Sequence, residues 1–134
     1  MLPDEDKRAL SQVRLEHARE CLLSSRNLLL AGDFRGASNR AYYAVFHGMR
    51  AVLALDGVDM KHHSGIITEF RKRYIKTGIF ERRLSEIIQT QSESRTSSDY
   101  DDFFVISREE TAEQVESAEF FVETIAKWLI FDTV

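Results

Sequence analysis

Four polar residues, Arg40, Tyr43, His47 and Arg50, follow one another at steps of three, four and three in the sequence. At about 100° per residue, a helix would carry all four within an arc of about 80°. Arginine can hold a phosphate through two parallel hydrogen bonds, and histidine can move a proton near neutral pH. Together these groups suit cleavage of a phosphodiester by attack of the neighbouring 2′-hydroxyl.

The same stripe also has a purely structural interpretation. The residues around it are largely apolar, and burying an arginine or an imidazole without partners costs several kcal/mol. The four side chains must therefore pair internally, meet a subunit boundary or line a cleft. In the structural alternative, Arg40 and Arg50 pair with acids of the last helix, while Tyr43 and His47 make hydrogen bonds within the fold. The sequence leaves both interpretations open.

Other signatures of catalysis are missing from the sequence. It contains no Gly-rich phosphate loop, no set of cysteines for zinc, and no Ser/His/Asp or Cys/His order. His62 and His63 adjoin Lys61, and His17 stands alone in the first helical pattern, without carboxylates at metal-ligand spacing. We interpret these histidines as solvated loop residues and expect no metal or other cofactor.

Charge is distributed unevenly along the chain, whose formal net charge is −4. Residues 61–85 carry seven basic and two acidic side chains, and residues 86–134 carry three basic and twelve acidic ones. The net charge argues against a surface built entirely for nucleic acid, but the basic segment predicts local contact with a polyanion that weakens with salt. A mixed, solvated surface would give the same pattern. The residues concerned are Arg71, Lys72, Arg73, Lys76, Arg82 and Arg83.

Glycines divide the chain into helical segments. Gly32, Gly57 and Gly78 each follow an apolar-periodic stretch, where glycine can take the left-handed conformation that ends a helix. Ser107 and Glu110 have the Ser-x-x-Glu spacing of a capping box at a helix start. These signals predict helices near residues 4–31, 34–56, 64–77, 79–93 and 107–131, with an irregular link over 94–106.

Within each segment, apolar residues recur at three- and four-residue steps, as in helices that bury one face. The second segment is apolar over much of its circumference and rich in small residues, so we expect it at the centre of the fold. We therefore predict a single all-α domain over residues 1–134, an antiparallel up-and-down bundle of four to five helices. Core residues are expected to include Leu15, Ala18, Leu22, Ser25, Leu29, Ala37, Ala41, Ala44, Gly48, Ala51, Leu55, Ile67, Phe70, Tyr74, Phe80, Leu84, Ile87, Val115, Ala118, Val122, Ile125 and Leu129.

Composition and cysteine usage bear on the compartment. The chain is 43% hydrophobic and 30% charged, which is ordinary for a globular protein. Its single cysteine, Cys21, cannot form an internal disulfide, and no secretory leader pattern is present. The apolar runs are far shorter than the roughly 20 residues that span a bilayer. We therefore expect a cytoplasmic protein that does not enter a membrane.

Four runs of the sequence, taken in order, resemble a known family. They are Ser38-Asn39-Arg40-Ala41-Tyr42-Tyr43-Ala44-Val45-Phe46-His47, Lys61-His62-His63-Ser64-Gly65, Lys76-Thr77-Gly78, and Arg95 followed by Asp99-Tyr100. Over roughly residues 10–130 this ordered set resembles the small stand-alone HEPN proteins of bacteria and archaea. The resemblance implies a helical bundle, usually a homodimer, that is frequently paired with a minimal nucleotidyltransferase in a toxin–antitoxin or related defence module.

Many HEPN proteins are metal-independent ribonucleases, and the resemblance implies candidates for their catalytic pair. Those ribonucleases use an arginine followed, after four to six residues, by a histidine, with two copies meeting at the dimer cleft. Arg40 and His47 have six residues between them, on an early helix. Arg95 and Tyr100 have four and lie later, where the pair is expected, but a tyrosine with its usual pKa near 10 is a poor proton shuttle. Candidates for binding RNA or nucleotide beside these pairs are Tyr43, Arg50 and Asp99.

Three functions remain open on this evidence. The first is an RNA-cleaving, toxin-like subunit held in check by a nucleotidyltransferase partner. The second is a catalytically silent module that binds a nucleotide or forms the non-catalytic half of a transferase complex, and the third is a scaffold dimer. Aromatic residues late in the chain also favour a homodimer, because interfaces are enriched in them. They are Phe103, Phe104, Phe120, Phe121 and Trp128.

Overall fold

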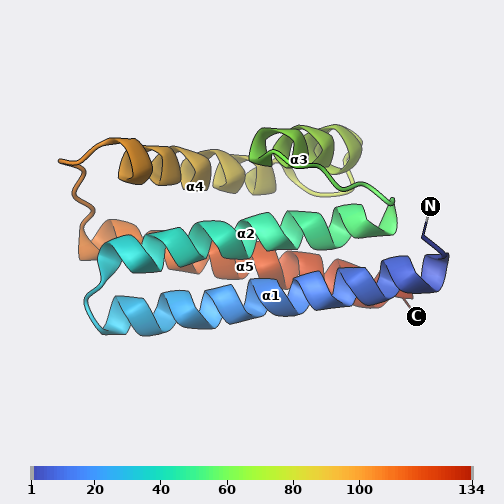
Figure 1. The fold of residues 1–134 in the computed structure, drawn as a ribbon, viewed down its shortest axis with the longest axis horizontal. Helices are drawn as coiled ribbons and strands as arrows, with labels where there is room; N and C mark the ends of the chain where they lie inside the picture. Colours follow the sequence, from blue (N-terminus) through green and yellow to red (C-terminus); the bar gives the residue numbers. More distant parts are fainter. Residues whose placement is uncertain (1, 134) are drawn as a thin grey trace.

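The structure, a computed structural model, describes residues 2–133, with side chains described through residue 130. Successive long helices run in opposite directions, with α1, α2 and α5 side by side and with α3 and α4 against α2 (Figure 1). Residues 2–133 contain no strand, which confirms the predicted all-α bundle. The elements are α1 (Asp4–Leu30), α2 (Phe34–Leu55), α3 (His63–Phe70), the π-helical turn η1 (Arg71–Ile75), α4 (Arg82–Tyr100) and α5 (Arg108–Thr133).

The central helix of the bundle is α2, as predicted from its apolar circumference, because it contacts α1, α3, α4 and α5. Its small residues let the neighbouring helices approach closely, and Ala37, Ala41 and Ala44 are fully buried. A Cβ atom added at Gly48 would lie 3.3 Å from Cε1 of Phe121 on α5. The small residues of α2 therefore hold the helix, and with it the polar stripe defined above, close to the neighbouring helices.

The predicted helix ends are largely where the structure places them. Gly32, Gly57 and Gly78 all have positive φ angles, of 84°, 71° and 79°. At the start of α5, the backbone N–H of Glu110 donates to Oγ of Ser107 over 3.1 Å, and that hydroxyl lies 3.2 Å from Oε1 of Glu110. The capping prediction at this helix start is confirmed.

The predicted irregular link over residues 94–106 is wrong in its first half, because α4 continues to Tyr100. Polar side chains tie this extension to neighbouring helices. The Gln91 amide donates to the Gln114 carbonyl on α5 over 2.8 Å, and the Ser94 hydroxyl lies 3.1 Å from that of Ser38 on α2. A run rich in serine has weak helix propensity, and these tertiary contacts offset that preference.

Most of the predicted core residues are buried around α2 and α5. Leu29, Leu55 and Ile67 are the exceptions, since they are only half-buried. The helix predicted over 64–77 is divided, because α3 ends at Phe70 and η1 follows. No helix within the described residues combines the length and apolarity needed to cross a membrane.

Candidate functional site

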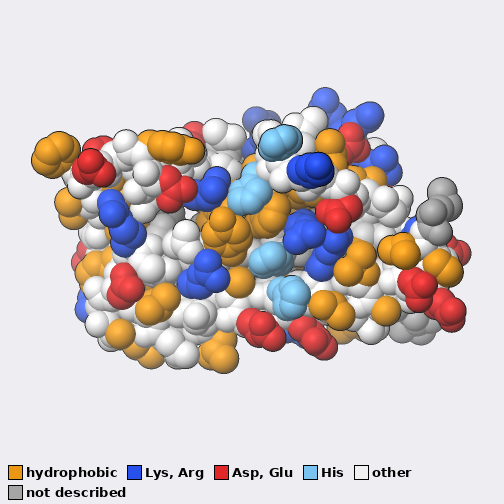
Figure 2. Space-filling model, in the orientation of Figure 1, with side chains coloured by type: hydrophobic (Ala, Val, Ile, Leu, Met, Phe, Trp, Pro, Cys, Tyr) orange, Lys and Arg blue, Asp and Glu red, His pale blue; other side chains and the backbone are white. Residues whose placement is uncertain are grey.

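The polar stripe of α2 lies on a face of the bundle where histidines form a band with basic side chains on both sides (Figure 2). Arg40, Tyr43, His47 and Arg50 are all half-buried, so each exposes part of its side chain while resting on apolar neighbours. The helical spacing predicted from the sequence therefore holds. We call this surface, together with the side chains from other helices that reach it, the histidine face.

His47 is the centre of the histidine face. Its ring meets the ring of His17 on α1 edge-on, with the centroids 5.8 Å apart, and lies 6.1 Å from the Tyr43 ring. Its Nδ1 atom is buried and has no hydrogen-bond partner among the described residues. Burial, with the positive charge of Arg50 and weaker contributions from nearby basic groups, lowers the pKa of His47 to about 4. The imidazole is therefore neutral at pH 7.

The two arginines of the stripe have different partners. The Arg40 guanidinium lies 5.1 Å from the Tyr43 ring centroid, and its Nη2 donates to Oδ1 of Asn39 over 2.9 Å. Arg50 lies 3.4 Å from the Asp59 carboxylate. Neither arginine pairs with an acid of α5 in the described residues, so that part of the structural alternative is wrong. Arg40 has no carboxylate partner there and keeps its charge available to a ligand.

A third basic group near the stripe is Arg14, which α1 contributes. Its side chain is buried and lies 3.3 Å from the Asp59 carboxylate, which also holds Arg50. Its Nη1 donates to the Arg50 carbonyl over 3.3 Å. Sequence reasoning missed Arg14 and the role of His17, although their three-residue spacing places them on one face of a helix. That spacing was the available signal.

Arg95 reaches the histidine face from α4. Its guanidinium lies 5.1 Å from the Tyr42 ring centroid and 6.0 Å from that of Tyr43, within reach of cation–π attraction. Nε lies 3.6 Å from the Asp99 carboxylate, an ion pair too long for a hydrogen bond, and this buried atom has no hydrogen-bond partner in the described residues. The structure thus brings Arg95 and Asp99 to the same surface as the α2 stripe.

His63 completes this aromatic surface. Its Nδ1 lies 2.9 Å from the Tyr42 hydroxyl, and its ring lies 4.2 Å from that of Phe46. Burial, followed by the charges of Arg95 and Arg50, lowers the pKa of His63. The interpretation of a solvated loop histidine is therefore wrong for this residue, although it holds for the exposed His62.

Other candidates from the sequence lie apart from the histidine face. Tyr100 ends α4 with 85% of its surface exposed, and the structure describes no contact between it and Arg95. A five-residue step turns a helix by about 140°, which separates the two side chains. The second Arg-containing pair is thus not assembled within one chain.

The basic segment after α3 is partly engaged in structural contacts. Arg71 donates to the Ser85 hydroxyl over 3.0 Å, and Arg73 lies 2.8 Å from a Glu69 carboxylate oxygen. Lys72 and Lys76 are exposed and have no ion pair within residues 2–130. Contact of this segment with a polyanion stays a prediction. Lys72 and Lys76 are the residues best placed to make that contact.

The arrangement at the histidine face can hold an anion and exchange a proton. Arginines with few acidic partners supply charge and donors, and a neutral imidazole supplies a proton acceptor. Among residues 2–130, no group of three or more His, Cys, Asp or Glu side chains is placed to hold a metal ion.

Comparison with known proteins identifies the family of this chain. The HEPN domain family matches residues 11–128. A protein of Thermotoga maritima named "UPF0332 protein" is 30% identical over 122 residues, which cover 91% of this chain and 92% of that protein. Two proteins of Methanocaldococcus jannaschii, named "Putative toxin MJ0142" and "Putative toxin MJ0605", are 32% and 33% identical and cover 92% and 96% of this chain and 84% and 95% of their own length. The chain therefore belongs to the HEPN family.

Proposed function

We propose that this HEPN protein binds the phosphate backbone of RNA across its histidine face and cleaves it without a metal ion. One observation supports the proposal most directly. Arg40 and Arg50 of α2 place positive charge beside the neutral His47, whose buried Nδ1 has no hydrogen-bond partner in the described part of the chain. Arg95 of α4 lies over the neighbouring Tyr43 ring. Clustered arginines with few acidic partners favour an anion, and RNA is an anion whose own 2′-hydroxyl is a nucleophile.

The proposed reaction is an internal transfer within RNA. The 2′-oxygen attacks the adjacent phosphorus, His47 accepts the proton of that hydroxyl, and the bond from phosphorus to the 5′-oxygen breaks. The leaving 5′-oxygen takes a proton from water or from a second imidazole, and His17 lies beside His47. The products are a 2′,3′-cyclic phosphate and a 5′-hydroxyl. Arg40 and Arg95 stabilise the negative charge that grows on the phosphate oxygens.

A phosphate would also change the basicity of His47. A pKa of about 4 makes the free imidazole a weak base at pH 7. A bound phosphate brings negative charge beside the ring and offsets the charge of Arg50, which raises the pKa toward its ordinary value. Substrate binding would thus make His47 a stronger base.

A second candidate function is a catalytically silent module that binds RNA or a nucleotide. The observation favouring it is Tyr100, which stands where the HEPN ribonuclease motif has histidine and is exposed away from Arg95. In this case the histidine face binds its ligand without cleaving it. The chain would then serve a minimal nucleotidyltransferase as a binding or scaffold subunit.

The names of the relatives bear on the biological role. Two relatives are named as putative toxins. We extend this to the present chain as a toxin-like role in a toxin–antitoxin or defence pair, with a minimal nucleotidyltransferase as the partner that restrains it. A homodimer is part of the same proposal.

The test measures RNA cleavage and RNA binding by the purified protein with a chelator present. We expect His47→Gln to lower cleavage by about 100-fold or more, the usual contribution of a general base, while RNA binding remains. Arg40→Gln and Arg95→Gln should weaken binding as well, because they remove phosphate contacts. The melting temperature of each variant is measured to confirm folding.

The control variants address the other candidate residues. Tyr100→Phe should leave cleavage unchanged, and a double change of Lys72 and Lys76 to glutamine should weaken binding mainly at low salt. Cleavage that survives His47→Gln would contradict the catalytic proposal. RNA binding by the wild-type protein without any cyclic-phosphate product would instead establish the silent alternative.

A further inference from the structure

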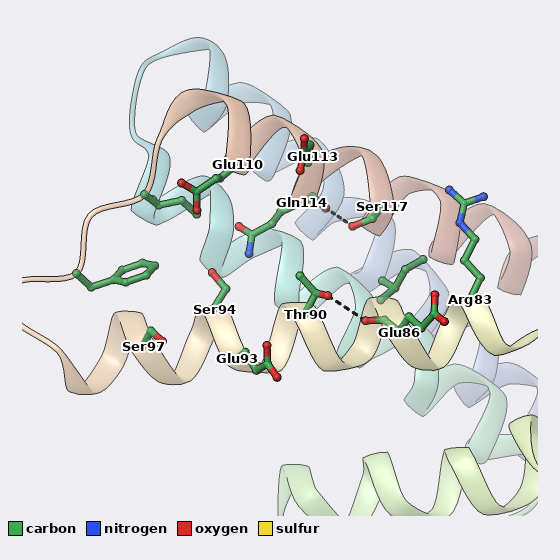
Figure 3. A pocket seen from close by; sticks show the side chains of 13 residues that line it. Arg83, Glu86, Thr90, Glu93, Ser94, Ser97, Glu110, Glu113, Gln114 and Ser117 are labelled. Carbon is green, nitrogen blue, oxygen red and sulfur yellow. Dashed lines mark hydrogen bonds between the residues drawn. The ribbon is translucent and has the colours of Figure 1, made fainter.

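A hollow lies between α4 and α5 and shares no residue with the histidine face. It has a volume of about 500 Å³, within the range of roughly 300–1,000 Å³ that is usual for ligand pockets. Figure 3 shows its two walls, with Glu86 and Glu93 on α4 and Glu110 and Glu113 on α5. We call this hollow the acidic groove.

The charges of the acidic groove are poorly balanced. Among the described residues that line it, Arg83 is the only basic one, and its guanidinium lies 3.8 Å from the Phe120 ring centroid. Among residues 2–130, no ion pair reaches Glu93, Glu110 or Glu113. These carboxylates are exposed, so the surface presents negative charge that no cation among the described residues neutralises through an ion pair.

A buried acceptor points into the same groove. Gln114 is 6% exposed, and its side chain extends from α5 toward α4 (Figure 3). Its Oε1 has no hydrogen-bond partner in the described part of the chain. A buried amide oxygen without a donor is unfavourable, so a ligand that brings an N–H donor to this oxygen gains binding free energy. The glutamates favour a cation, and the Gln114 oxygen independently favours a hydrogen-bond donor.

The floor of the acidic groove is apolar. Ile87 and Ile106 are buried there, and Phe104 is half-buried at one end. A simple inorganic cation would leave this surface uncovered. A chain segment that carries arginine or lysine beside apolar side chains would pair with the glutamates of the walls and cover the apolar floor.

We propose that the acidic groove docks a basic, partly apolar segment of a different protein. Its arginine or lysine side chains lie between the glutamates of α4 and α5, and its apolar side chains cover Ile87 and Ile106. The groove repels phosphate, so this partner and a nucleic acid would occupy different surfaces of one chain. The proposal does not depend on the function proposed for the histidine face.

A second copy of this chain fits the groove less well. In its own basic segment, Arg71 already donates a hydrogen bond to Ser85, and Arg73 already forms ion pairs with Glu69 and Asp56. Of the others, Lys72 and Lys76 lack the planar fork that pairs with two carboxylate oxygens. Arg83 lines the groove itself, and Arg82 lies 3.9 Å from Glu86 of the groove in its own chain. A contact between this segment and the groove would also join different surfaces of the two copies, which in general builds open chains rather than a closed dimer.

The test measures binding of short fluorescent peptides to the full chain by anisotropy. One peptide alternates arginine with leucine and the other alternates glutamate with leucine. We expect the basic peptide to bind and the acidic peptide to fail. The groove variant changes Glu93 and Glu113 together to glutamine, and the matched control makes the same change at Glu116 and Glu123, exposed residues of α5 outside the groove.

The groove variant should bind the basic peptide about tenfold more weakly than the control variant, the scale of losing one charge-assisted hydrogen bond. Equal weakening in both variants would mean diffuse attraction to an acidic surface and would overturn the proposal. Failure of the wild-type protein to bind the basic peptide would also overturn it. So would self-association of the wild type that the groove variant abolishes, because the occupant would then be a second copy.

Discussion

At the scale of single residues, the charge around His47 is one-sided. The groups that lower its pKa after burial are Arg50, His17, Arg40 and Arg14, all basic. Asp59 partly neutralises Arg14 and Arg50, but no carboxylate contacts the imidazole in the described residues. The folded protein therefore resists protonation of this ring, which has a measurable consequence for stability.

We predict that the free energy of unfolding falls as the pH is lowered from about 6.5 to about 4, in part because of His47. The unfolded chain binds a proton at the ordinary pKa of 6.5, whereas the folded protein binds it only near 4. Protons in this range therefore favour the unfolded state. The His47 share is on the order of 1–2 kcal/mol, because the ring is only half-buried. Urea unfolding at several pH values measures it.

The variant His47→Gln isolates this contribution, because glutamine does not titrate. Its stability should fall less steeply with decreasing pH than that of the wild type. His63, whose pKa is also lowered, contributes in the same direction in both proteins and cancels in the comparison. Parallel pH profiles for the two proteins would show that His47 does not titrate as the structure requires.

At the scale of elements, the position of the stripe depends on how closely α2 and α5 approach. Gly48 lies on the buried side of α2, and a Cβ atom there would already lie 3.3 Å from Cε1 of Phe121 and 3.8 Å from Cγ1 of Ile125. Both neighbours are fully buried and cannot move away freely. The packing of the two helices therefore requires a small residue at this point.

We predict that Gly48→Leu lowers the free energy of unfolding by about 1–3 kcal/mol, the usual cost of forcing extra carbon atoms into a filled core. Gly48→Ala should be close to neutral, because the higher helix propensity of alanine, worth about 1 kcal/mol, offsets the tight contact. Chemical denaturation of the two variants beside the wild type provides the comparison. Equal stability of the leucine variant and the wild type would show that α5 does not approach as described.

At the scale of the whole molecule, the described surface carries apolar side chains that have no cover within the chain. Tyr100, Phe103 and Val105 at the α4–α5 connection are 85%, 91% and 85% exposed. Among the aromatic residues expected at an interface, Phe121 is instead fully buried, and Trp128 and Phe120 pack against the core. Phe103 is therefore the aromatic residue best placed to meet a second copy.

We predict a homodimer at micromolar concentration, with Phe103 and Val105 in the contact. The double variant Phe103→Ser, Val105→Ser should shift the protein toward a monomer, because it removes the exposed apolar side chains that association would bury. Sedimentation equilibrium measures the mass of both proteins. The control variant Leu30→Ser removes an apolar residue that is 81% exposed elsewhere and should leave the mass unchanged. A monomeric wild type would refute the prediction.

Local patterns in the sequence determined most of the fold. Helical periodicity marked α1, α2 and α5, because burial of one helix face sets the spacing of apolar residues along the chain. Gly32 and Gly57 marked the ends of α1 and α2, and the Ser-x-x-Glu spacing of Ser107 and Glu110 marked the start of α5. The spacing of Arg40, Tyr43, His47 and Arg50 likewise fixed their common face before any packing was known. These features need only the geometry of one helix.

Contacts between helices decided the rest, and only the tertiary structure records them. The continuation of α4 through residues 94–100 is supported by the contact of the Ser94 hydroxyl with Ser38 of α2, and by the hydrogen bond of Gln91 to α5 just before this stretch. These contacts offset weak local helix propensity. The meeting of His17, His63 and Arg95 at His47 and its aromatic neighbours joins residues from three further helices. No local rule sets which faces of separate helices meet, because the packing of side chains across the whole core fixes their rotation.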